Sequence, residues 1–460
     1  MNRYPRLVIA GTHSGVGKTM VTLALLAALK RLGRHVQAFK AGPDFIDAGH
    51  HTAITGRPSR NLDGWMLGKS MNREIFARGA CDADLSIIEG MMGLFDGSSP
   101  VDEKGSTAEL AKQLAAPVLL VIDGSAMARS VAATASGYAC FDPQVRVAGV
   151  LFNRIGGEGH YHLLKDAVEA ETDLAVVGYL KPDPALTIQD RHLGLMTAIE
   201  QQSTTLVDRL AQAAAETVDV DRVEQLAYQA DGDDLFPIPV PSKEQTGGRV
   251  RIGIAYDPAF CFYYKDNLEL LEMLGAELVR FSPMNDEALP DVELLYFGGG
   301  YPELYGERLA ANVGMRKAIR SFAERGGAVY GECGGMMYLT QSIRDFENRS
   351  HDMVGLFPAE AVMSKTTMTL GYRVLEMSSA CLLGAAGTRA KGHEFHYSRL
   401  EATGPLHYAC VLTDAQGNSM GRDGLMVGNT LALYTHLHFG SEPAIAMALV
   451  AAAQQRIGAR

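Results

Sequence analysis

The chain has 460 residues, which is enough for two or three domains that each bury a hydrophobic core. Hydrophobic residues make up 47% and charged residues 21% of the sequence, as is ordinary for globular proteins. The formal net charge of -11 opposes nonspecific binding to nucleic acid, so an anionic substrate would need a local basic pocket.

The cysteines are scattered along the chain, and no two of them have the C-x-x-C spacing of a zinc or redox motif. This distribution in a long chain indicates reduced thiols. The apolar run at residues 7–10 is shorter than the hydrophobic region of a signal peptide, and no apolar run approaches the length of a membrane span. We therefore expect a cytoplasmic protein with no membrane or nucleic-acid partner.

In chain order, the first half alternates apolar, β-branched runs with segments of helical pattern. Residues 6–11 predict a strand, and residues 18–33 predict a helix that ends at Gly33. Near-continuous apolar runs are typical of strands buried on both faces of a parallel sheet, so we predict an α/β doubly wound, mostly parallel fold. Its further strands are predicted at residues 36–42, 85–90, 117–123, 146–153 and 174–180.

Residues 231–248 interrupt this alternation, because they are rich in proline, glycine and charge, as linkers are. A second α/β series follows, with a helix predicted at residues 266–275. Its strands are predicted at residues 249–257, 276–282, 292–300 and 327–335. We therefore predict two α/β domains, residues 1–235 and 249–460, joined by a linker at 236–248.

The segment after the first predicted strand, GTHSGVGKT, nearly matches the phosphate-binding pattern G-x-x-x-x-G-K-[ST]. Its first glycine stands one position too early, and a glycine turn with a surface lysine is the alternative. The flanking strand and helix favour a phosphate loop, because a helix N-terminus offers amide donors and a positive dipole. The lysine can reach the phosphates, and the threonine can hold Mg²⁺. The predicted nucleotide-binding residues are Gly11, Thr12, Gly15, Gly17, Lys18 and Thr19.

Charged residues follow two further predicted strands. Lys40 lies near the end of the strand predicted at 36–42, and Asp44 and Asp47 follow that strand. Glu89 likewise lies near the end of the strand predicted at 85–90, and Asp96 follows it. Ligands of open α/β sheets bind at the carboxyl ends of the strands. The sequence therefore predicts that these acids and Lys40 meet the nucleotide and its metal.

Cys333 lies in the tight turn GECGG between a predicted strand and a helical segment. The turn resembles a nucleophile elbow, whose position at a helix N-terminus is expected to lower the pKa of the thiol. The glycines at 298–300 could donate amides to an oxyanion hole, and His436 and His438 could act as bases. A buried structural thiol is the alternative for Cys333.

The sequence resembles the cobyrinic acid a,c-diamide synthase family over essentially its whole length. The motifs that carry this resemblance are, in order, GTHSGVGKT, FKAGPDFIDAGHHTAITGRPSRNLDGWML, EGMMGLFDG, FGGGYPE, GECGGMMYL, GHEFHYS and THLHFG. The loop with the displaced glycine is similar to the one in dethiobiotin synthetase and its amidotransferase relatives.

The resemblance implies a ligase with an N-terminal dethiobiotin-synthetase-like P-loop domain and a C-terminal class I glutamine amidotransferase α/β domain. The C-terminal domain would hydrolyse L-glutamine and release ammonia. The N-terminal domain would use ATP and Mg²⁺ to phosphorylate the a and c side-chain carboxylates of cobyrinic acid, a corrinoid of cobalamin biosynthesis. Ammonia would then displace phosphate to form two amides.

The resemblance also implies roles for individual residues. Lys18 would bind phosphate, Cys333 would be the nucleophile, His436 would be the base, and Asn153 would contact the nucleotide base. Many class I enzymes have a glutamate two residues after the histidine, but this chain has His438 there, so Glu394 is considered as the third member. The metal or acyl-phosphate residues would be Thr19, Asp44, Asp47, Glu89 and Asp96, and the oxyanion amides would come from Gly298, Gly299, Gly300 and Gly334.

We predict that a basic cluster meets the substrate carboxylates, because arginine pairs with them bidentately. Its members would be Arg57, Arg60 and Arg191, with His192 beside them. Solvated surface residues are the alternative. The sequence leaves open a homodimer, a hydrogenobyrinic acid or nickel-sirohydrochlorin substrate, and, from another class, a nucleotide-binding regulatory protein with an inactive amidotransferase domain.

Overall fold

The computed structural model describes residues 4–186, 190–191, 194–200, 204–230 and 250–459. The chain forms two compact units, Met1–Ile238 and Pro239–Arg460. The linker predicted at residues 236–248 lies outside the described residues. No helix among the described residues is long and apolar enough to cross a membrane.

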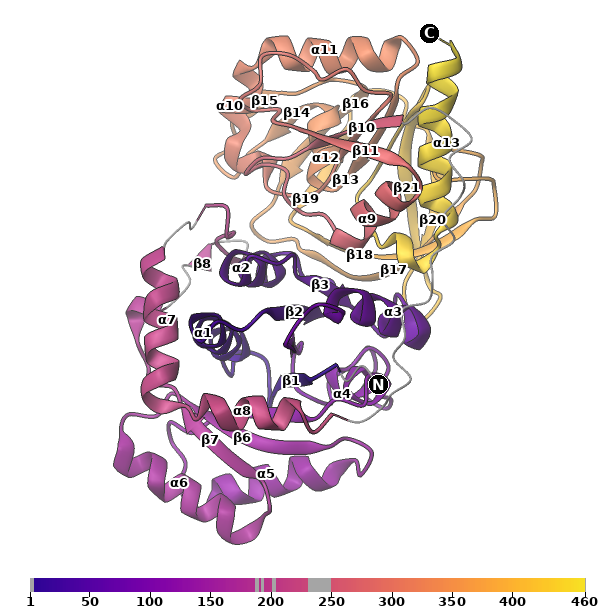
Figure 1. Ribbon diagram of the computed structural model, residues 1–460. Helices are drawn as coiled ribbons and strands as arrows, with labels where there is room; N and C mark the ends of the chain where they lie inside the picture. The colour runs from indigo at the N-terminus through magenta and orange to yellow at the C-terminus, as the bar shows by residue number, and fades with distance from the viewer. Residues whose placement is uncertain (1–3, 187–189, 192–193, 201–203, 231–249, 460) are drawn as a thin grey trace. The chain divides into compact units, whose positions relative to one another are not determined.

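A seven-stranded sheet forms the centre of the N-terminal unit (Figure 1). Its strand order is β3-β2-β4-β1-β5-β6-β7. All its neighbouring strands are parallel. The strands are β1 (Arg6–Gly11), β2 (Val36–Ala41), β3 (Arg60–Leu62), β4 (Leu85–Glu89), β5 (Val118–Asp123), β6 (Val147–Asn153) and β7 (Ala175–Tyr179). The sequence predicted all of them except the short edge strand β3.

Helices cover both faces of this sheet, as the doubly wound prediction requires. The strands alternate their side chains between two cores: Val8 of β1 faces one core, whereas Leu7 and Ile9 face the other. Each such buried side chain contributes roughly 1.5–3 kcal/mol to folding. The first core packs against α3 (Gly68–Ala80), α4 (Thr107–Gln113), α5 (Ser130–Phe141) and α6 (Glu158–Glu171). The second packs against α1 (Lys18–Arg31), α2 (Ile46–Thr55), α7 (Thr204–Thr217) and α8 (Val220–Ala227).

The C-terminal unit has a ten-stranded mixed sheet in the order β11-β10-β12-β13-β22-β21-β20-β17-β18-β23. The strands from β11 to β22 pair in parallel, and the remaining pairs are antiparallel. The parallel strands are β10 (Val250–Ala255), β11 (Ala276–Phe281), β12 (Leu294–Phe297), β13 (Ala328–Glu332) and β22 (Thr430–Leu433). The antiparallel strands are β17 (Thr369–Met377), β18 (Arg389–His396), β20 (Tyr408–Thr413), β21 (Ser419–Val427) and β23 (His436–Leu437).

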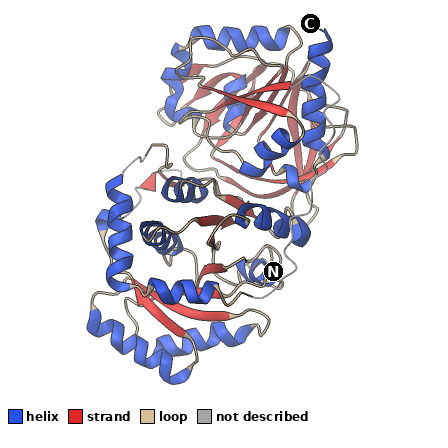
Figure 2. Cartoon of the chain, in the orientation of Figure 1, coloured by secondary structure: helices blue, strands red, loops and turns tan. Residues whose placement is uncertain are grey.

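Smaller elements complete the two units, and Figure 2 shows how strand-rich the C-terminal unit is. Its second sheet has the order β15-β14-β16-β19 and comprises β14 (Thr340–Arg344), β15 (Ser350–Asp352), β16 (Phe357–Met363) and β19 (Ser398–Ala402). Its helices are α9 (Lys265–Met273), α10 (Gly306–Ala311), α11 (Val313–Glu324), α12 (Gly334–Leu339) and α13 (Ala444–Ala459). In the N-terminal unit, β8 (Asp190–Arg191) and β9 (Gly194–Leu195) form a two-stranded sheet.

Candidate functional site

The loop between β1 and α1 has the geometry of an anion-binding turn. Gly17 has a φ of 99°, in the left-handed region that favours glycine, and it precedes the first residue of α1. Asn153, the last residue of β6, donates from Nδ2 to the carbonyl of Val16 at 2.9 Å and lies where a Cβ at Gly17 would stand. Asn153 therefore supports this loop from the end of β6, two strands away from β1 in the sheet.

Lys18 turns back over the loop instead of extending into solvent. Its Nζ lies 3.4 Å from the carbonyl of His13 and also donates to the carbonyl of Met92. Burial, with Lys40 adding repulsion, lowers the pKa of Lys18. The side chain therefore holds its ammonium at the edge where β1 and β4 end.

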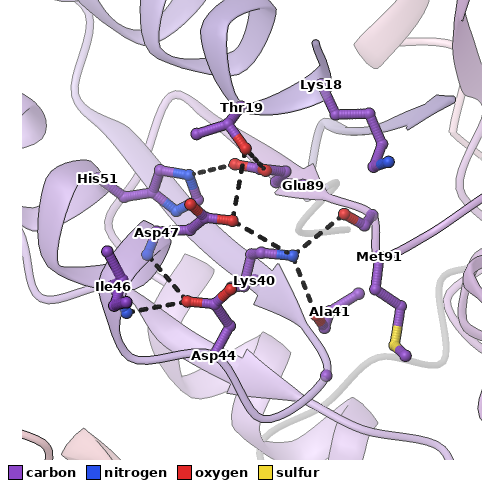
Figure 3. A network of polar contacts seen from close by, with 12 residues as sticks. Lys18, Thr19, Lys40, Ala41, Asp44, Ile46, Asp47, His51, Glu89 and Met91 are labelled. Carbon is purple, nitrogen blue, oxygen red and sulfur yellow. Dashed lines mark hydrogen bonds and ion pairs between the residues drawn. The ribbon is translucent and has the colours of Figure 1, made fainter. Parts of the chain in front are cut away.

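A buried polar network lies beside this loop (Figure 3). Thr19 donates to Glu89 Oε1 at 2.7 Å and lies 3.4 Å from Asp47 Oδ2. Lys40 Nζ lies 3.7 Å from Asp47 Oδ2, and Lys40 is paired in register with Glu89 across the sheet. Three separate strand–helix junctions thus bring a hydroxyl, two carboxylates and one ammonium together, at the edge that the sequence predicted.

The charges of this network are unequal. Burial raises the pKa of Glu89, but Lys40 and His51 lower it by more, to about 2. Burial, together with the nearby Asp44 and Glu89, raises the pKa of Asp47 well above its usual range. A bound cation would relieve the repulsion between Asp47 and its neighbouring carboxylates, so the network would gain stability from one.

The donor set fits Mg²⁺ in a phosphate-transfer site. No three His, Cys, Asp or Glu side chains within the described part of the chain form a complete metal cage. Magnesium in such sites commonly takes one or two carboxylates, water and substrate phosphates. Thr19 with Glu89 and Asp47 offers such a partial set.

His51 is a member of this network that sequence reasoning missed. Its Nε2 lies 2.7 Å from Glu89 Oε2 and its Nδ1 lies 3.3 Å from Ser59 Oγ, and the ring is fully buried in α2. The only sequence signal for it was the position of the histidine one helical turn after Asp47. His51 therefore fixes the carboxylate that Thr19 contacts from the other side.

Asp44 and Asp96 lie at the edges of the network with local structural bonds. Asp44 Oδ1 accepts from the amides of Ile46 and Asp47 at 2.8 and 2.9 Å, so it caps the start of α2. Asp96 Oδ2 accepts from the amide of Gly93 at 2.8 Å. Both carboxylates lie near the loop, but each accepts hydrogen bonds from backbone amides of its own turn.

Arg57 and Arg60, two members of the predicted basic cluster, already contact other parts of the fold. Arg57 donates to Asp82 Oδ2 at 3.1 Å and to Gln37 near the amino end of β2, opposite the edge that carries Thr19. Arg60 is buried and packs against Gly79 of α3. The Arg57 guanidinium therefore lies near the amino end of β2, away from a ligand at the carboxyl ends of the strands. Arg60 instead pairs in register with Phe39 of the same strand.

Arg191 falls within β8, but its side chain and all of His192 lie outside the described residues. The segment that follows lies close to the acidic network. The carbonyl of Met196 is 2.8 Å from Nε2 of His50, and His50 belongs to the same helix as Asp47. The backbone therefore places this segment beside α2.

In the C-terminal unit, Cys333 adopts a strained backbone conformation between β13 and α12. Its φ of 46° and ψ of -105° are rare for a residue with a side chain, and its amide donates to the carbonyl of Leu433 at 2.7 Å. Strain of this kind is typical of a nucleophile elbow. The predicted turn is therefore present.

The prediction that the Cys333 thiol has a lowered pKa was wrong. Burial, with the nearby acid Glu303 adding to it, raises the pKa of Cys333 well above its usual value. The six-residue helix α12 does not offset that burial. Burial also lowers the pKa of His436 well below its usual value. Both shifts favour the uncharged forms, a thiol and a neutral imidazole, and a neutral imidazole can accept a proton.

Two of the glycines predicted to donate amides to an oxyanion hole, Gly298 and Gly299, have other partners. The amide of Gly298 donates to the Tyr263 hydroxyl at 2.8 Å, and the amide of Gly299 donates to the carbonyl of Phe262 at 3.2 Å. Gly300 and Gly334 lie against each other, since a Cβ at Gly334 would stand 3.1 Å from the Gly300 nitrogen. Two amide groups are thus brought together next to Cys333.

His436 lies in β23, close to the same glycine segment. A Cβ at Gly299 would collide with its ring, and the ring stacks on His393 at 5.0 Å between centroids. His438 does not take the place of the missing glutamate, because its Nδ1 accepts from the amide of Gly440 at 3.1 Å. Glu394 pairs instead with Arg373 at 2.6 Å.

Comparisons with known proteins agree with this two-site arrangement. Residues 7–195 match the CobQ/CobB/MinD/ParA nucleotide binding domain, and residues 251–444 match the CobB/CobQ-like glutamine amidotransferase domain. The cobyrinate a,c-diamide synthase of Priestia megaterium is 45% identical over 95% of this chain and 94% of its own length. The Salmonella typhimurium protein of that name is 41% identical over 98% of this chain and 99% of its own length. The chain therefore belongs to the cobyrinate a,c-diamide synthase family.

Proposed function

We propose that the protein is an ATP- and glutamine-dependent ligase that amidates the a and c side-chain carboxylates of cobyrinic acid in cobalamin biosynthesis. The observation that carries this proposal is the presence, in one chain, of a phosphate loop with an acidic network and a strained cysteine with a histidine. The experiment that tests it measures ATP-dependent amidation of cobyrinic acid with glutamine or ammonia as the nitrogen source.

In the N-terminal unit, the phosphate loop and the acidic network would activate a substrate carboxylate for amidation. A carboxylate is a poor acyl donor until its oxygen becomes part of a phosphate leaving group. Lys18 and the amides of Gly15 and Gly17 would hold the ATP phosphates, and Asn153 would contact the base. Thr19, Glu89 and Asp47 would hold Mg²⁺, which neutralises phosphate charge when bound. Lys40, Asp44 and Asp96 would complete the charge balance around the acyl phosphate.

In the C-terminal unit, the residues present would release ammonia from glutamine. His436 would take the proton of Cys333, and the sulfur would attack the amide carbon to form a thioester. The same imidazole would protonate the departing ammonia, and water would then hydrolyse the thioester to glutamate. The amides of Gly300 and Gly334 would stabilise the oxyanion of each tetrahedral intermediate.

Arg191 remains a proposed contact for a substrate carboxylate. We expect Arg191→Gln to raise the KM for cobyrinic acid by roughly tenfold or more, since a hydrogen bond to a charged group contributes about 1.5–3 kcal/mol. Glutaminase turnover should not change. Arg57→Gln is the matched control, because Arg57 pairs with Asp82 at the other edge of the sheet. An equal rise in KM for both variants, or no rise for Arg191→Gln, would remove Arg191 from the site.

His51 is proposed to position Glu89. We expect His51→Ala to slow amidation by roughly tenfold with either nitrogen source, because the buried carboxylate loses a charge-assisted hydrogen bond of about 1.5–3 kcal/mol. His51→Gln, which keeps a donor, should recover part of the rate. Steady-state rates at saturating ATP test this. Normal amidation by the alanine variant would show that Glu89 needs no such support.

Two alternatives predict different results in the same assays. Hydrogenobyrinic acid or a nickel-sirohydrochlorin as the true substrate would give faster amidation of that macrocycle than of cobyrinic acid. A regulatory protein with an inactive amidotransferase domain would show no glutaminase activity, although both Cys333 and His436 are present. The names of the relatives favour neither alternative.

The boundaries, setting and assembly of the protein are also proposals. We propose an amidoligase domain at residues 1–235, a linker at 236–248 and an amidotransferase domain at 249–460. We infer a cytoplasmic protein, because its substrates would be ATP, glutamine and a water-soluble macrocycle carboxylate. A homodimer is the assembly that we consider beside a monomer.

A further inference from the structure

Glu332 is a buried carboxyl that the mechanism above does not use. It is the last residue of β13, directly before Cys333, and only 1% of its surface is exposed. Its Oε1 accepts from the Tyr330 hydroxyl at 2.6 Å and lies 3.4 Å from the amide nitrogen of Leu437. Its Oε2 lies 3.9 Å from Nδ1 of His436. Glu332 thus reaches from the nucleophile strand to the imidazole of β23.

No other acid considered for this place has a comparable position. Glu394 is held by Arg373, and the position two residues after His436 carries a histidine that accepts from Gly440. In Cys–His sites, one ring nitrogen exchanges the proton with the thiol while the other faces a group that orients the ring. Since Nδ1 of His436 faces Glu332, Nε2 is the ring nitrogen available to exchange a proton with the thiol.

We propose that Glu332 is the positioning residue that orients His436 and stabilises its protonated form during glutamine hydrolysis. This inference rests on the proposed amidotransferase function of the C-terminal unit. The proton moves from the Cys333 sulfur to the imidazole, and the positive charge then forms beside the carboxyl group. A carboxylate next to that charge lowers the barrier, because opposite charges attract strongly in a buried site.

The surroundings of Glu332 suit this role. Burial raises the pKa of Glu332 to about 8 beside the neutral imidazole, and a positive charge on His436 would lower that pKa again, so the carboxylate is favoured as the imidazolium forms. The Tyr330 hydroxyl and the Leu437 backbone amide both contact Oε1, and they fix the carboxyl group relative to the strand that carries His436. The group is therefore held in place before glutamine binds.

Glu332→Gln tests the inference in the full-length enzyme, because glutamine has the same shape but cannot balance an imidazolium. We expect the glutaminase kcat to fall by at least about tenfold, part of the contribution of about 10²–10⁴ that general acid–base catalysis makes. The KM for glutamine should stay within roughly twofold. Amidation driven by added ammonium should stay unchanged, which shows that the variant folds. Glu394→Gln is the matched control and should keep the glutaminase kcat.

Each other outcome has a distinct meaning. A normal glutaminase kcat in Glu332→Gln would overturn the inference, and so would an equal loss of the glutamine and ammonium rates, which would mark Glu332 as merely structural. A loss confined to Glu394→Gln would assign the role to Glu394 instead. Full glutamine use by Cys333→Ala, in contrast, would reject the amidotransferase function itself.

Discussion

Lys18→Ala should abolish amidation with glutamine and with ammonia alike, with a loss of at least about 10²-fold. Removing a charge-assisted phosphate contact costs about 1.5–3 kcal/mol in binding. Removing a donor to charge that develops in a transition state costs about 10²–10³ in kcat. Both nitrogen sources need the acyl phosphate, so neither can bypass this lesion. Rates of ADP formation and of amide formation, measured side by side, test the expectation.

Lys30→Ala is the matched control, because Lys30 belongs to the same helix and donates to the carbonyl of Ile54, away from the phosphate loop. It should keep near-normal amidation. Glutaminase turnover should survive in both variants, since it requires only the C-terminal unit. ATP-dependent amidation by Lys18→Ala at the normal rate would reject the nucleotide assignment.

Cys333→Ala should destroy glutamine-dependent amidation and spare amidation driven by ammonium salts. The glutamine amide is inert without a nucleophile. Without the thiol, the acid–base catalysis by the histidine, which contributes about 10²–10⁴ to the rate, is lost as well. Ammonia from solution bypasses the thioester but still needs the acyl phosphate formed near Lys18. His436→Ala should behave in the same way. The ratio of the two rates for each variant is the measurement.

Cys381→Ala is a suitable control, because Cys381 is a half-buried free thiol of the same unit that lies outside the proposed active site. It should keep both rates. If Cys333→Ala retained full glutamine use, the thioester mechanism would have to be dropped. If it lost the ammonium rate as well, the substitution would have damaged more than the nucleophile, and His436→Ala would decide the matter.

Local signals in the sequence explain why much of the architecture could be predicted. A parallel strand buried on both faces leaves a continuous apolar run, so β1 and β4 stand out, and their carboxyl ends must share one edge. Placing Thr19 and Glu89 at that edge follows directly, and a hydrogen bond of 2.7 Å joins them. Cys333 was equally visible, because the elbow is a contiguous turn.

Interactions between distant residues explain what the sequence did not reveal. The strands β14 to β21, most of which pair antiparallel, carry mixed polar and apolar patterns and were not predicted. Charge type alone suggested a substrate site at Arg57, but its partner Asp82 stands 25 residues further along the chain. The high pKa of Cys333 depends on burial by the whole unit, and the proximity of Glu332 to His436 depends on the pairing around β13.

The mass of the product distinguishes a diamide synthase from the alternatives. The protein would be incubated with cobyrinic acid, ATP, Mg²⁺ and glutamine labelled with ¹⁵N at the amide. We expect a product in which two carboxylates have become amides, both carrying the label, and no such product when ATP is omitted. Unchanged cobyrinic acid under conditions in which the protein hydrolyses glutamine, or amides formed without ATP, would contradict this expectation.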